Sequence, residues 1–167
     1  MKNYQHSISI DAAPEDVFDY LADIKHLPDY LPTVQNAEPQ SGEWVRVQGE
    51  AAGRSYEVDT YFHVERENMR IEWGANGEDK YRGLLQVEPN ESSRDNTITG
   101  EATNCQLAVH IFFEPRAAQN KASQKQREDR DEVIHEDIQK ALFSIKNYCE
   151  GIGGNIETRT AKQGTRR

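Results

Sequence analysis

The side chains in this sequence that could do acid–base or metal chemistry do not gather into a recognised motif. The histidines are His6, His26, His63, His110 and His135, and no two stand at a spacing typical of metal ligands. The sequence also contains no nucleophile motif and no glycine-rich loop of the kind that binds phosphate. We therefore predict no metal site, no cofactor and no identifiable catalytic residue.

The phase of the surrounding strands and helix places the other candidates on polar faces. His63 and His110 fall on the polar phase of two alternating segments, and His135 lies in "VIHED" at the polar start of a helical segment. Glu72 and Arg82 are predicted to face each other on the wet side of adjacent strands, as a surface ion pair. A base on these faces would not reach a substrate held on the opposite face.

The register of the last strand stays open at this point. The segment "TITGEATN" (97–104) is either the start of that strand or a separate short strand. A bulge near Asn104 would shift every later residue by one position and would turn His110 and Phe112 inward.

Composition limits the classes of partner. The chain has 167 residues, a net charge of −9 and 35% apolar residues, which suits one domain with one core. An acidic protein repels nucleic-acid phosphates and anionic membranes, so we expect neither as a main partner. Because no apolar run approaches a membrane span and no hydrophobic signal core follows Met1, we expect a cytoplasmic protein without membrane insertion. Cys105 and Cys149 are then expected to be reduced core thiols.

Hydrophobic periodicity predicts a strand followed by two short helices. Residues 4–10 end in alternating isoleucines, which indicates a strand. Pro14 suits a first helical turn, and apolar residues then recur at helical spacing. Pro28 marks a break, after which residues 28–31 can form one more turn before Pro32. This break predicts two short helices that meet at an angle.

The rest of the chain predicts an antiparallel meander and one long helix. Alternating runs, separated by turn residues, occupy 45–47, 56–65, 69–73, 81–87 and 107–113. Residues 133–152 carry one apolar stripe at helical spacing, while residues 116–132 are almost wholly polar and form either the start of that helix or a loop. We predict one domain over residues 1–154 and a disordered polar tail over residues 155–167.

Three stretches carry a family resemblance that spans most of the chain. They are "ISIDAAPEDVFDYLADIKHLPDYLPTV" (8–34), "RIEWG" (70–74) and "YRGLLQVEP" (81–89). With them the chain resembles the START/Bet v 1-like superfamily, also called the SRPBCC or polyketide cyclase/dehydrase and lipid transport group. The Leu-Pro-x-Tyr segment is similar to the coenzyme Q-binding branch. The resemblance implies an α+β helix-grip fold, in which a curved antiparallel sheet wraps a long C-terminal helix and two short helices close one end. It also implies an internal cavity for apolar molecules.

The inward phase of the strands and the helix stripe define a set of residues that we predict to line a ligand site. Its members are Tyr56, Val58, Thr60, Phe62, Ile71, Trp73, Tyr81, Leu85, Val109, Ile111, Ile138, Leu142 and Ile145. Each of them is also compatible with plain core packing, which is the commoner role of apolar residues. Hydroxyls and the Trp73 indole would orient a ligand, and Gly83 on the same face would leave room or allow a bend in the sheet.

Three functions stay open at this stage. The first is a binding or carrier protein for a hydrophobic small molecule such as a lipid, an isoprenoid quinone or a polyketide. The second is a cyclase-like or dehydratase-like enzyme, which would need an acid or base inside the cavity. The inward set offers only hydroxyls and an indole, which favours binding over catalysis. The third is a ligand-free interaction module, which a filled cavity would support.

Overall fold

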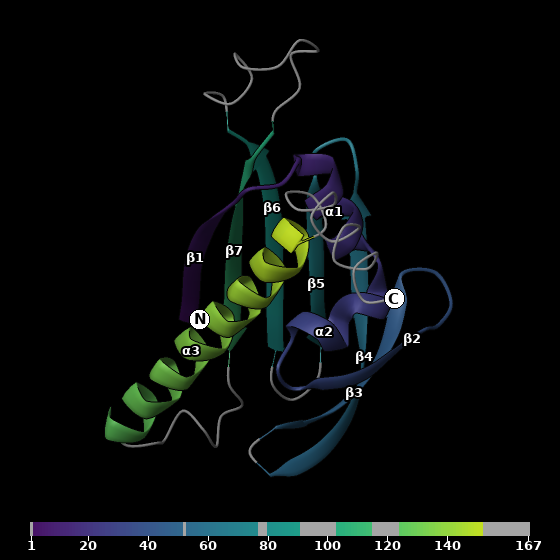
Figure 1. Ribbon diagram of the computed structural model, residues 1–167. Coiled ribbons are helices and arrows are strands. Elements are labelled where there is room, and N and C mark those ends of the chain that lie inside the picture. The colour runs from purple at the N-terminus through teal and green to yellow at the C-terminus, as the bar shows by residue number, and fades with distance from the viewer. Residues whose placement is uncertain (1, 52, 77–79, 91–102, 115–123, 152–167) are drawn as a thin grey trace, which may run out of the picture.

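A seven-stranded antiparallel sheet forms the frame of the protein (Figure 1). The computed structural model describes residues 2–51, 53–76, 80–90, 103–114 and 124–151. The strands are β1 (Lys2–Ile10), β2 (Val34–Pro39), β3 (Trp44–Ala51), β4 (Arg54–Glu65), β5 (Arg70–Asn76), β6 (Lys80–Pro89) and β7 (Cys105–Glu114). Their order across the sheet is β1-β7-β6-β5-β4-β3-β2, so the first strand pairs with the last.

The helices lie on one face of this curved sheet. They are α1 (Pro14–Ala22), the 3₁₀ turn η1 (Ile24–His26), α2 (Leu27–Tyr30) and α3 (Gln124–Cys149). Figure 1 shows α3 running diagonally across the sheet, with α1 and α2 beside its C-terminal half. This arrangement is the α+β helix-grip fold that the sequence predicted.

The break between the two short helices follows the predicted proline pattern with one difference. Pro14 begins α1, which buries Val17, Phe18 and Leu21 almost completely. The helix α2 begins at Leu27, one residue before the predicted boundary, and Pro28 sits in its first turn. A missing N–H has no cost in a first turn, because no intrahelical acceptor waits for it.

The long helix is bound to the core by its C-terminal half. Ile138, Leu142, Ile145 and Cys149 recur at helical spacing and are buried, as the apolar stripe predicts. The helix begins at Gln124, so the second part of the polar stretch is the start of α3 rather than a loop. Residues 115–123 and the predicted tail 155–167 lie outside the described residues.

The register of the last strand is continuous. The pairing of β6 with β7 runs without a shift from Lys80↔Glu114 to Pro89↔Cys105. His110 therefore points to the outer face of the sheet, away from α3, and its Nε2 lies 3.0 Å from Oδ1 of Asn3. The part of "TITGEATN" before residue 103 lies outside the described residues.

Candidate functional site

The sheet register brings the predicted strand residues onto the face that carries α3, here called the concave face. On β1, Tyr4 and His6 contact α3 directly, and they pair with Ile111 and Val109 of β7. Directly opposite residues of paired strands share a face, so the same face continues across the sheet. The pairs that continue it are Val109↔Leu85, Leu85↔Ile71, Ile111↔Gly83, Gly83↔Trp73, Trp73↔Phe62, Thr60↔Val45 and Val58↔Val47.

Burial divides the predicted set into two groups. The buried members are Thr60, Phe62, Ile71, Leu85, Val109, Ile138, Leu142 and Ile145. The half-buried members are Tyr56, Val58, Trp73, Tyr81 and Ile111. Residues in the interior of a closed core lose nearly all contact with water, so the second group marks apolar surface that α3 leaves uncovered.

Trp73 occupies the space that was predicted to be open at Gly83. An added Cβ at Gly83 would stand 2.0 Å from Cζ2 of the Trp73 indole, far inside contact distance. Glycine is therefore required there because the indole lies against its backbone, and the expectation of free room at Gly83 is wrong. The indole forms part of the floor of the concave face.

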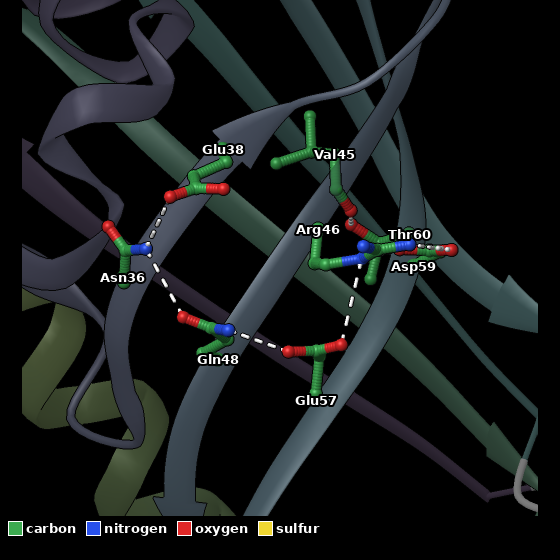
Figure 2. Close-up of polar contacts among 8 residues, drawn as sticks. All are labelled: Asn36, Glu38, Val45, Arg46, Gln48, Glu57, Asp59 and Thr60. Carbon is green, nitrogen blue, oxygen red and sulfur yellow. Dashed lines mark hydrogen bonds and ion pairs between the residues drawn. The ribbon is translucent and has the colours of Figure 1, made fainter.

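The hydroxyls of the predicted set differ in their availability. Tyr56 donates to the backbone carbonyl of Thr33 at 3.1 Å. Figure 2 shows Thr60, which donates to the backbone carbonyl of Val45 at 3.3 Å. Among the described residues, the hydroxyl of Tyr81 has no hydrogen-bond partner. Burial raises the pKa of Tyr81 to about 12, so this hydroxyl stays protonated and can donate at neutral pH.

A polar cluster on β1 and α3 completes the concave face, and the sequence analysis missed it. The hydroxyl of Tyr4 donates to Oδ1 of Asp131 at 2.6 Å, and Nζ of Lys2 donates to Oδ2 of the same carboxylate at 2.9 Å. Nε2 of His6 lies 2.7 Å from Nδ1 of His135. This contact joins two histidines that lie 129 residues apart in the sequence. The alternation that placed the isoleucines of β1 inward, if extended back along the strand, would have found Lys2, Tyr4 and His6.

The titratable groups of this cluster influence one another. Burial alone would raise the pKa of Asp131, but the hydrogen bonds from Tyr4 and Lys2 outweigh it and hold that pKa below its usual range. Burial, and then the charge of His135, lower the pKa of His6. Within the described ranges, no three histidine, cysteine or acidic side chains come close enough together to hold a metal ion.

The outer face of the sheet is lined by polar pairs, as predicted, although not by the pair that was named. Glu72 accepts a hydrogen bond from Arg70 at 2.7 Å, whereas Arg82 lies over the ring of Phe112 at 4.9 Å. The predicted Glu72–Arg82 ion pair is wrong because the register sets Glu72 opposite Leu84. Both residues lie on the outer face, as predicted, but they are not directly opposite each other.

A ladder of side chains crosses β2, β3 and β4 on the outer face (Figure 2). Asn36 donates to Gln48 at 3.2 Å, and Gln48 donates to Glu57 at 2.6 Å. Arg46 donates from Nε to Asp59 at 2.9 Å. His63, on the same face, bonds to Glu43. These contacts all lie on the outer face of the sheet. The candidate site is on the opposite, concave face.

A groove of about 450 Å³ lies outside the concave face, between α2 and α3. It is lined by Pro28, Asp29, Tyr30, Leu31, Pro32, Lys140, Phe143, Ser144 and Asn147. The groove contains no member of the predicted inward set. It lies along the angled helices that were predicted to close one end of the sheet.

The two cysteines lie in the core, as the sequence analysis expected. Cys105 and Cys149 are free and buried, and burial raises their pKa values to about 11 and about 12. Thiols with such pKa values stay protonated and unreactive near neutral pH. None of the helices in the described ranges has the length and apolar content needed to cross a membrane.

Comparisons with known proteins agree with this architecture. The family model described as polyketide cyclase/dehydrase and lipid transport matches residues 1–150. A sequence comparison with curated proteins finds no match. The Zhui aromatase/cyclase from Streptomyces sp. R1128 has a TM-score of 0.66 and 16% identity, and the superposition covers 90% of this chain and 94% of that chain.

Two further solved structures have the same fold. A START superfamily protein from Mycobacterium smegmatis has a TM-score of 0.65 and 14% identity, over 90% of this chain and 98% of that chain. The di-domain aromatase/cyclase BexL, from the BE-7585A biosynthetic pathway, has a TM-score of 0.67 and 15% identity, over 88% of this chain. The chain spans only 46% of BexL. At these identities the likeness shows the fold alone.

Proposed function

The chain belongs to the polyketide cyclase/dehydrase and lipid transport family, and from that premise we propose that it binds a hydrophobic small molecule on the concave face beneath α3. The ligand class is a lipid, an isoprenoid quinone or a polyketide-like compound. The bound molecule would cover the half-buried apolar side chains of Tyr56, Val58, Trp73 and Ile111.

One observation carries this proposal. The concave face is fully buried along the row of Ile71, Leu85 and Val109, but Trp73 and Ile111, in the next row, are only half-buried. Each Å² of apolar surface that stays accessible, instead of being buried in a closed core, lowers the stabilising free energy by about 25 cal/mol. An apolar ligand seated there would recover that free energy, and the Tyr81 hydroxyl would supply a donor for orientation.

Native mass spectrometry of the gently purified full chain tests the proposal. We expect a species heavier than the bare protein, whose extra mass is recovered as a small apolar compound by solvent extraction. An experimental structure in which side chains fill the whole space between the sheet and α3 would contradict it. That result would favour the ligand-free interaction module instead.

A matched pair of substitutions on β7 locates the binding face. Ile111→Trp adds bulk to the concave face, and Phe112→Trp changes the neighbouring side chain on the outer face. We expect Ile111→Trp to lose the co-purified compound and Phe112→Trp to keep it. Circular dichroism of both variants checks that a loss does not come from unfolding.

The polar cluster on β1 and α3 favours a second candidate, a cyclase-like or dehydratase-like enzyme. His6, Tyr4 and Asp131 place acid–base groups on the face where the ligand would lie, which the sequence analysis did not foresee. If the protein converts its ligand, His6→Asn should co-purify with a compound of different mass from the wild-type compound. Identical compounds in both proteins would leave binding as the function.

A further inference from the structure

We propose that the ligand carries an anionic group, most simply a carboxylate, which the guanidinium of Arg130 binds at one end of the concave face. This inference rests on the proposed function and names the chemical class of its ligand. It starts from the position of Arg130 on α3, beside the polar cluster but outside its hydrogen bonds.

Arg130 reaches the concave face at β7. Its guanidinium carbon lies 5.9 Å from the centroid of the Phe113 ring. Phe113 pairs with Tyr81 on one side and with Lys2 on the other, and it shares their face of the sheet. The guanidinium therefore sits between α3 and the sheet, at the same end as the half-buried side chains Tyr81 and Ile111.

One donor of Arg130 is unpaired within the described residues. Its Nε is buried and has no acceptor there. The neighbouring carboxylate of Asp131 accepts its hydrogen bonds from Tyr4 and Lys2, and the charge of Arg130 helps to lower its pKa. Arg70 has the same buried and unpaired Nε, but its Nη2 donates to Glu72 at 2.7 Å. Lys146 and Arg66 bond to Glu150 and Asp19. A buried donor without an acceptor is destabilising, and an anionic ligand would remove that cost.

The geometry of the donors suits a carboxylate. A guanidinium presents a planar fork that can bond both oxygens of a carboxylate at once, and such charge-assisted bonds are strong where water is excluded. The overall charge of −9 repels anions in solution, so selectivity for an acid would have to come from these local groups.

The inferred ligand is thus an amphipathic acid. Its apolar body would lie along Ile111, Trp73 and Val58, and its carboxylate would lie at Arg130. An apolar molecule of the same length without the acid would gain the contacts of the body only. The ratio of the two affinities therefore isolates the contribution of the anionic group.

Isothermal titration of the delipidated full chain with dodecanoate and with dodecanol measures this ratio. We expect dodecanoate to bind about tenfold more tightly or better, which is the contribution of one charge-assisted hydrogen bond. Arg130→Gln should remove the difference, and Arg130→Lys should keep part of it. Arg127→Gln, which changes an exposed arginine almost one turn earlier on α3, should leave it unchanged.

The outcomes separate this inference from the function on which it rests. Equal binding of the two probes, or a preference for dodecanoate that survives Arg130→Gln, would overturn the anionic-group inference and leave apolar binding in place. Failure of both probes to bind up to the solubility limit of each would overturn both. Circular dichroism of Arg130→Gln, together with retained dodecanol binding, shows that the variant is folded.

Discussion

Nε2 of His6 and Nδ1 of His135 lie 2.7 Å apart and join the first strand of the sheet to the long helix. At this distance one ring donates and the other accepts, so the contact requires at least one neutral imidazole. Tyr4 packs edge-on against the His135 ring, with 5.2 Å between the centroids, and donates to Asp131 one helical turn away. The N-terminal half of α3 is therefore attached to β1 mainly by polar contacts.

The first prediction concerns acid stability. The pKa of His6 is lowered from 6.5 in the folded state. As the pH falls, the unfolded chain therefore binds this proton at a higher pH than the folded chain does. The contribution of His6 to the free energy of unfolding is present above the pKa of the unfolded state and is lost as the pH falls toward the lower pKa of the folded state. We expect thermal midpoints between about pH 8 and about pH 5 to fall more steeply for the wild type than for His6→Asn.

His63 provides a control of opposite sign. Its bond to Glu43 raises its pKa, so its contribution is present at low pH and is lost as the pH rises through the raised value. His63→Gln should therefore not reduce the acid sensitivity of the protein. Equal pH slopes in the wild type and His6→Asn would refute the role given to the His6–His135 contact.

The second prediction concerns Asp131. Replacement by Asn removes the charge that accepts from Tyr4 and Lys2, and it weakens two of the contacts between α3 and β1. We expect Asp131→Asn to lower the free energy of unfolding by about 1–2 kcal/mol. Chemical denaturation measures this, with Glu132→Gln on the exposed side of the same turn as the control. A loss of equal size in the control would show a general charge effect.

The third prediction concerns the contact between Trp73 and Gly83. Gly83→Ala places a methyl group where the indole lies, so the indole must move or the strands must separate. We expect a loss of about 1–3 kcal/mol in the free energy of unfolding, as overpacking usually costs. The chain has two tryptophans, so the emission of Trp73 is best followed in a Trp44→Phe background. Unchanged emission and stability would contradict the close approach.

The fourth prediction ranks the hydroxyls of the concave face. Tyr81→Phe should weaken binding of the co-purified compound about fivefold, because one hydrogen bond to the ligand is lost. Tyr56→Phe should have a smaller effect, since its hydroxyl already bonds to the Thr33 carbonyl. Titration calorimetry of both variants gives the comparison. A larger loss from Tyr56→Phe would place the polar end of the ligand elsewhere.

The fifth prediction concerns the outer face. Arg46→Gln removes the exposed ion pairs with Asp59 and Glu57, which are screened by salt. We expect dodecanoate affinity to stay the same and the small change in thermal midpoint to shrink at high salt. An altered affinity for dodecanoate would mean that the ladder on β2, β3 and β4 influences binding on the concave face.

The strand phases were predictable because each strand has one wet face and one dry face. Thr60, Phe62, Ile71 and Leu85 all lie on the concave face, as their alternation indicates. The start of α3 was left open because its first three turns carry few apolar residues, so no stripe distinguishes a solvated helix from a loop. Its position over β1, which comes from the tertiary fold, fixes it as a helix.

The cluster that gives the candidate site its charge was not predictable as a set. His6 and His135 are 129 residues apart, and no local pattern links them. The same holds for Arg130, whose reach toward Phe113 depends on where α3 crosses the sheet. The occupied hydroxyl of Thr60 and the indole against Gly83 depend on strand register, which alternation alone does not fix.

The pairing of β1 with β7 has a consequence for how the chain is made. Within this domain β1 is made before its partner strand β7 and before α3, so the backbone edge of β1 stays unpaired while β2 to β6 are made. The closing step joins residues at opposite ends of the domain, which makes it slow relative to the hairpins from β2 to β6. Newly made chains are therefore most vulnerable to aggregation through their N-terminal strand.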